Sequence, residues 1–199
     1  MGILNWLTSK LKPMAQPVSL EPVKRNLGLE YVQDKTGLDI TAYRKIAHMV
    51  NDHACAAAEE FARFFGEKPT DQLVHYFHDM FIAVCILPNM RKLSADDDTA
   101  SAIVDGIHFE FYENASPAVV ESILQVLAEK PTCFFQTFVK GRGGNGRTVM
   151  RFAQMAACCI DADRVLGAPN SFQLPFVLMR IVKEKGRSIC TALDIMLDI

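Results

Sequence analysis

One short segment of the chain, residues 140–148, combines glycine with basic side chains more densely than any other stretch. It consists of Lys140, Gly141, Arg142, Gly143, Gly144, Asn145, Gly146, Arg147 and Thr148. Glycine lets a backbone approach a ligand closely and turn its N–H groups toward it. Arginine supplies planar donors that suit phosphate and carboxylate groups. The segment is therefore predicted to be an anion-binding loop.

The spacing of this loop matches a nucleotide-binding P-loop, except that Arg147 stands where that motif has lysine. A P-loop enzyme also needs a parallel sheet and an acidic residue at the end of a second strand. Residues 149–199 are patterned as helices instead. The loop is thus predicted to contact a phosphate-bearing ligand, a nucleic acid or an acidic partner side chain. The alternative is a solvated connection that binds nothing.

A second set of residues able to do chemistry is spread along the chain as His53, the adjacent pair His78 and Asp79, and Asp163. Imidazole and carboxylate groups together can hold a divalent metal and leave one position for water. The order of these residues resembles the signature of the HD-domain phosphohydrolases. The resemblance implies an all-α fold and a divalent metal on these four residues, which activates water against a phosphate ester or nucleotide.

The sequence also supports a different interpretation of the histidines. His78 lies on an apolar stripe, as a core histidine does, and Met80 follows the pair where the family usually has glycine or proline. Two further pairs at helical spacing could be chosen equally well: His48 with Asp52, and Asp105 with His108.

The elements that must position these residues are predicted to be helices, because apolar residues recur at spacings of three and four. Gly66, Pro88 and Gly186 are expected to end helices, while Asp96 and Ser116 are expected to begin them. The predicted helices are 41–65, 70–87, one from 96, one from 116, 149–166, 176–185 and 189–197. Residues 132–139 fit a short strand or a short helix. We therefore predict a compact all-α domain of about six to eight helices.

The first residues form a separate arm in this interpretation. Residues 2–11 have the spacing of an amphipathic helix, and residues 12–24 contain three prolines typical of a linker. The arm is predicted to dock on a protein partner or a membrane surface; packing back on its own domain is the alternative. Its docking residues would be Ile3, Leu4, Trp6, Leu7 and Leu11. The predicted division is an arm and linker, 1–24, and a helical domain, 25–199.

The composition limits the classes of protein to which this chain can belong. A chain of 199 residues with 50% hydrophobic residues can build one sizeable core, and a net charge of −2 argues against a domain that coats nucleic acid. The six cysteines include no C-x-x-C pair, which suits a reducing compartment. The longest apolar run, residues 80–87, is too short to span a bilayer. We expect a cytoplasmic protein with no membrane span.

These features together predict a non-enzymatic helical binding or adaptor protein, an accessory component of a larger assembly, without a cofactor. The alternative is an HD-type metal-dependent phosphohydrolase with a divalent metal as cofactor. The discriminating observation is whether His53, His78, Asp79 and Asp163 meet around one point.

Overall fold

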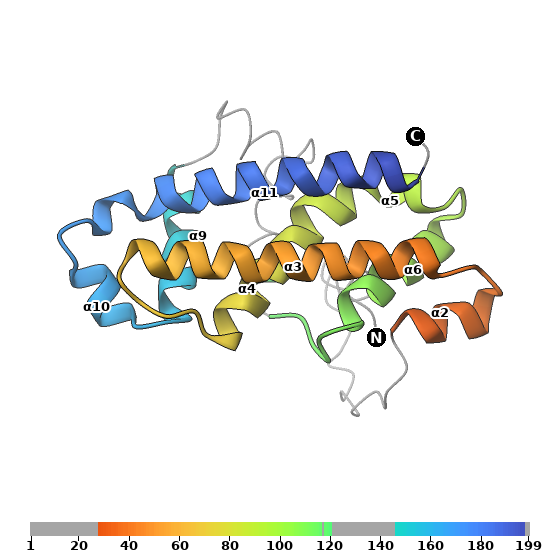
Figure 1. Cartoon of the computed structure of the whole chain (residues 1–199), viewed down its shortest axis with the longest axis horizontal. Helices are drawn as coiled ribbons and strands as arrows, with labels where there is room; N and C mark the ends of the chain where they lie inside the picture. The colour runs from red at the N-terminus through yellow and green to blue at the C-terminus, as the bar shows by residue number, and fades with distance from the viewer. Residues whose placement is uncertain (1–27, 117, 121–145, 198–199) are drawn as a thin grey trace, which may run out of the picture.

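The computed structural model describes residues 28–116, 118–120 and 146–197, which are coloured in Figure 1. In these ranges the chain forms eight α-helices and no strand, which confirms the predicted all-α class. The elements are α2 Leu29–Thr36, α3 Thr41–Phe64, α4 Asp71–Phe81, the π-helix η1 Ile82–Ile86, the 3-10 helix η2 Leu87–Asn89, α5 Met90–Leu93, α6 Asp97–Phe109, α9 Gly146–Cys158, α10 Ala162–Gly167, the 3-10 helix η3 Ser171–Gln173 and α11 Leu174–Met196.

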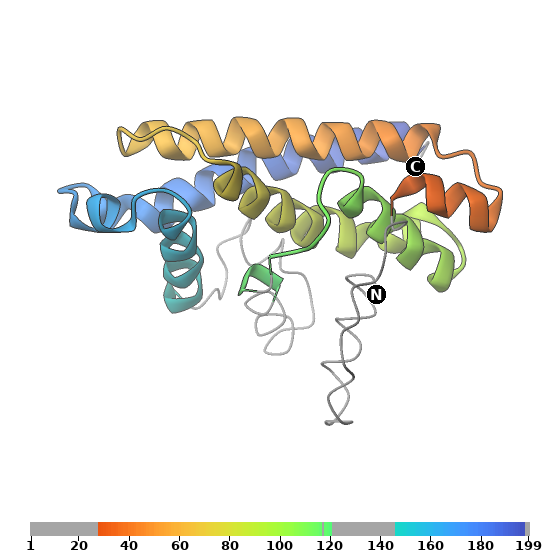
Figure 2. The same ribbon diagram turned by 90° about the horizontal axis from the view of Figure 1, so that it is seen from below.

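The two longest helices, α3 and α11, run side by side and form one layer of the described structure (Figure 1). Figure 2 shows α4 and α6 beneath that layer, with α9 packed under α11. Large apolar side chains close the space between the layers, among them Phe61 from α3, Phe77 from α4 and Ile181 from α11, all fully buried. Burial of each such side chain stabilises the fold by roughly 1.5–3 kcal/mol.

Capping residues set the helix boundaries as the sequence predicts. Thr70 accepts a hydrogen bond from the backbone N–H of Leu73 at the start of α4, and Asp96 does the same for Thr99 at the start of α6. At the end of α3, Gly66 has a φ of 74°, a left-handed conformation that glycine adopts without strain. These caps fix where the helices that carry the site begin.

The helix predicted for residues 70–87 is regular only to Phe81. The path then continues through the π-helix η1, the 3-10 helix η2 with Pro88 near its start, and α5. Residues 71–93 together are the one helical segment, within the described ranges, that is long and apolar enough to cross a membrane. In this fold 67% of its most apolar window is buried inside the protein, where it packs on α3.

Two boundaries predicted in the C-terminal part are wrong. Residues 149–166 form two helices rather than one, because Asp161 accepts a hydrogen bond from the Arg164 N–H and so begins a new helix, α10. Gly186 does not end a helix: α11 continues through it to Met196. Glycine inside a helix costs about 1 kcal/mol relative to alanine. Burial of Ile181, Ile189 and Leu193 along the same face outweighs that cost.

Helix α2 is an element that the sequence analysis did not predict. Leu29 and Val32 pack against α6 at Gly106, where a Cβ atom would lie only 2.9 Å from Leu29 Cδ2. A glycine is needed at this crossing because the two helices approach so closely. The contact positions α6, which carries His108 half a turn after Gly106.

Candidate metal centre

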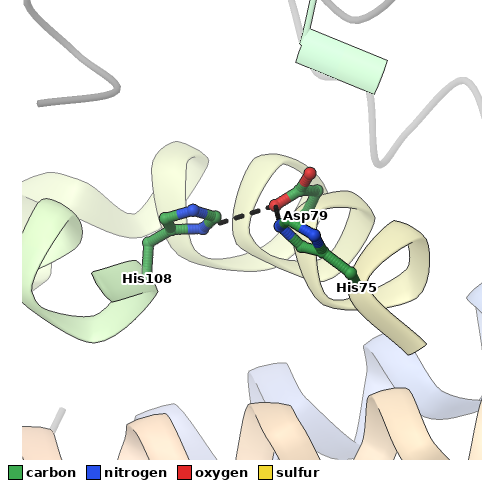
Figure 3. Close-up of side chains that lie close together, drawn as sticks. All are labelled: His75, Asp79 and His108. Atoms are coloured by element: carbon green, nitrogen blue, oxygen red, sulfur yellow. Dashed lines mark ion pairs between the residues drawn. The ribbon is translucent and has the colours of Figure 1, made fainter. Parts of the chain in front are cut away.

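Three side chains with metal-binding atoms meet between α4 and α6. His75 and Asp79 lie one turn apart on α4, and His108 lies in the last turn of α6 (Figure 3). Residues at i and i+4 share one helix face, so the His75 and Asp79 side chains point the same way. The Oδ1 atom of Asp79 lies 3.5 Å from His75 Nε2 and 3.4 Å from His108 Nδ1. All three potential ligand atoms lie within 4.8 Å of one another.

These separations suit a shared metal better than hydrogen bonds. A nitrogen–oxygen hydrogen bond is normally 2.7–3.2 Å long, and none forms between these atoms. Two ligands bound to a tetrahedral zinc ion at about 2.0–2.1 Å lie about 3.3 Å from each other. The 3.4 and 3.5 Å separations are therefore close to those of ligands on one ion.

Burial makes this arrangement unusual. Asp79 and His108 are nearly or completely inaccessible to solvent, and His75 is half-buried. Four nitrogen and oxygen atoms of the cluster are buried without a hydrogen-bond partner: His75 Nε2, Asp79 Oδ1 and both ring nitrogens of His108. Both ring nitrogens of the neighbouring His78 are also buried without a partner. Buried polar groups in folded proteins normally have partners. The cluster therefore has the donor chemistry of a site that is completed by a ligand.

The second oxygen of Asp79 is held by the backbone. The N–H of Ser116, in the segment after α6, donates to Asp79 Oδ2. This bond orients the carboxylate so that Oδ1 points between the two imidazoles, as Figure 3 shows. Hydrogen bonds of this kind around the ligands commonly orient metal-binding side chains.

The electrostatic environment favours the neutral imidazole at His108. Burial lowers the pKa of His108 to about 3 against the opposing effect of Asp79. At His75, interaction with the Asp79 carboxylate raises the pKa and outweighs the effect of burial. At 3.5 Å this interaction is an ion pair rather than a formed hydrogen bond. Because neutral imidazole is the form that binds metals, His108 is already in its ligand form near neutral pH.

Two further side chains border the three. The Tyr112 ring stacks on His75 with centroids 4.4 Å apart and planes 3° from parallel, and its hydroxyl donates to Asn51 Oδ1. His78 is fully buried, with its ring 5.3 Å from that of His108 and 4.6 Å from that of Tyr112. Burial lowers the pKa of His78 to about 3, so it too is neutral near pH 7.

The four residues of the HD resemblance do not form one group in the described structure. Asp79 belongs to the cluster and His78 lies beside it. His53 lies on α3, where Lys185 and Asp52 are its charged neighbours, and Asp163 is exposed on α10. The structure instead brings in His75, which the sequence analysis did not single out, and His108, which it considered only in a pair with Asp105.

The other predicted sites lie largely outside the described residues. This applies to the docking residues Ile3, Leu4, Trp6, Leu7 and Leu11 and to loop residues 140–145. Gly146, Arg147 and Thr148 form the first turn of α9, as the predicted loop-to-helix junction requires, but their side chains are not described. Anion binding by the loop and docking by the arm stay predictions.

Comparisons of this chain with protein-family models, with curated proteins and with solved structures found no match. A function is therefore inferred from the geometry of the described residues.

Proposed function

We propose that this protein binds a divalent transition-metal ion through His75, Asp79 and His108, and that its function depends on that ion. The observation that carries the proposal is the convergence of three buried ligand atoms that have no hydrogen-bond partner. Leaving a buried polar group unpaired costs about 1–3 kcal/mol. A bound cation would offset this cost at all three atoms at once.

The ligand set favours one class of ion. Two imidazoles and one carboxylate suit zinc and related first-row metals, whereas calcium and magnesium prefer an all-oxygen site. Neither of the cysteines closest in sequence, Cys55 and Cys85, contributes to the group. We therefore expect zinc to bind, with cobalt as a spectroscopic substitute.

The test is metal stoichiometry measured on purified, tag-free protein. After removal of metal with a chelator, dialysis against zinc should restore one ion per chain, and cobalt should give the visible absorption of a site with four or five ligands. His108→Ala and Asp79→Asn should each lower the affinity at least tenfold. His48→Ala is the matched control, because His48 is exposed and outside the cluster.

The proposal fails if wild-type protein binds no zinc at micromolar concentrations. It also fails if His108→Ala, folded by circular dichroism, binds the ion as tightly as His48→Ala does.

A second candidate function is metal-dependent hydrolysis of a phosphate ester or nucleotide. Structural zinc sites usually have four protein ligands, whereas catalytic sites have three and leave a position for water. The cluster supplies three, and the unpaired imidazole of His78 lies beside them. A panel of phosphomonoesters and nucleotides with zinc- or manganese-loaded protein tests this candidate. Hydrolysis that survives in Asp79→Asn would exclude it, and so would the absence of activity in fully loaded wild type.

A further inference from the structure

Two cysteines lie away from the His75–Asp79–His108 cluster, where the π-helix η1 meets α11. Cys85 lies inside η1 and Cys190 lies in the C-terminal half of α11. Figure 1 shows that half of α11 running alongside the segment that leads into α5. Cysteines more than a hundred residues apart in sequence are thus brought to one contact between two elements.

The packing of η1 against α11 brings the two cysteines close together. Cys85 Sγ lies 3.8 Å from the carbonyl oxygen of Gly186, which is one helical turn before Cys190. The Cys85 carbonyl itself accepts a hydrogen bond of 2.7 Å from the Asn89 side chain, which holds the last turn of η1. Interaction between the two thiols is the largest influence on the pKa of each, raising that of Cys85 and lowering that of Cys190. Both cysteines are free in this structure.

The two thiols differ in their access to solvent. Cys85 is fully buried, whereas Cys190 is only partly buried. Interaction with the Cys85 thiol lowers the pKa of Cys190 and outweighs the opposing effect of burial; Lys92 also lowers this pKa, and Asp194 opposes it. Lys92 and Asp194 also form an ion pair of 2.8 Å that ties α5 to the last turns of α11 beside the thiols. A partly exposed thiol whose pKa is lowered, next to a second thiol, is the arrangement of a redox-sensitive pair.

We propose that Cys85 and Cys190 are a peroxide-oxidisable dithiol site that closes to a disulfide between η1 and α11. The Cys190 thiolate attacks one oxygen of hydrogen peroxide; the O–O bond breaks, and the released hydroxide takes a proton to leave as water. The Cys85 sulfur then attacks the sulfur of the Cys190 sulfenic acid, the S–O bond breaks, and water leaves with the Cys85 proton. Together the thiols lose two electrons and two protons, and one peroxide is reduced to two waters.

The chain allows a direct test by peptide mapping. Cleavage after Arg63, Arg91 and Arg187 places Cys85 alone in residues 64–91 and Cys190 alone in residues 188–199. After treatment of native protein with a small excess of hydrogen peroxide, these two peptides should be found cross-linked. Free thiols should fall by two from the six in the sequence. Blocking thiols with an alkylating reagent before unfolding prevents exchange between cysteines.

Three variants sharpen the test. Cys85→Ser should abolish the cross-linked peptide and leave Cys190 as a sulfenic acid that a dimedone-type reagent traps. Cys190→Ser should abolish both products. Cys158→Ser is the matched control, because Cys158 is exposed and outside the pair, and it should leave the cross-link unchanged.

Two outcomes overturn the proposal. One is loss of two thiols that maps to residues 152–164, which contain the adjacent Cys158 and Cys159. The other is oxidation of Cys190 in wild type without any cross-link to Cys85. The wild-type map decides the question even if a serine variant fails to fold.

Discussion

At the scale of single residues, the informative feature is a set of polar atoms that the fold buries without partners. A hydrogen bond holds one oxygen of Asp79 and leaves the other facing His75 and His108. Folded domains are stable by only about 5–15 kcal/mol, so several unpaired buried groups are a large fraction of that margin. Such a cluster is expected to lower the stability of the metal-free protein, and a bound ligand is expected to offset that loss.

His108→Leu tests this interpretation in two states of the protein. In the presence of a chelator, the variant should be as stable as wild type or more stable, because leucine fills a similar volume and removes two unpaired nitrogens. With zinc at about a hundred times its dissociation constant, wild type should gain about 2.7 kcal/mol, and the variant should gain none. Thermal unfolding with and without zinc measures both effects. If the variant is strongly destabilised in chelator and wild type does not respond to zinc, His108 is an ordinary core residue.

At the scale of elements, the His75–Asp79–His108 cluster depends on how α6 packs against its neighbours. The close approach of α2 at Gly106 fixes the position of α6 two residues before His108. A methyl group there would press on Leu29 and on the stiff, branched side chain of Val32, at 2.9 and 3.0 Å. Both side chains are buried and have little room to move.

Gly106→Ala should therefore destabilise the protein by about 1–3 kcal/mol, the usual cost of overpacking, although alanine is the better helix former. Metal affinity should also fall, since α6 must shift to relieve the contact. Gly167→Ala is the matched control: a Cβ atom at that position meets nothing within 4 Å. Denaturant unfolding of the two variants measures the difference. Equal stability of the two would show that the α2–α6 contact is loose.

The same elements show what could be predicted from the sequence. Caps such as Thr70 and Asp96 act within one turn, so their helix starts were predicted correctly. The His75–Asp79 pair is also local, and its i, i+4 spacing could have been recognised. The partner on α6 could not, because the face of α6 that meets α4 is decided by packing with α2 and α3. Packing likewise overrides the helix-ending tendency of Gly186.

At the scale of the whole molecule, the core that the structure describes begins after the predicted arm. Its first buried residues are Leu29 and Val32 in α2, both after the predicted linker. The metal cluster lies in the layer formed by α4 and α6, and the thiol pair lies where η1 meets α11. Both proposed sites therefore lie within the predicted helical domain, residues 25–199. Binding to a protein partner, through the arm or the loop, is a separate prediction about the molecule.

Deletion of residues 2–24 separates these parts of the molecule. The shortened protein should unfold at the same temperature as the full chain and bind the same amount of zinc, because every described ligand and core residue remains. Deletion of residues 2–36 is the contrasting variant, since it also removes α2. Loss of the buried Leu29 and Val32 should cost roughly 1.5–3 kcal/mol each and lower the unfolding temperature by several degrees. If the shorter deletion already unfolds the protein, the arm is part of the core, and its predicted role in docking is wrong.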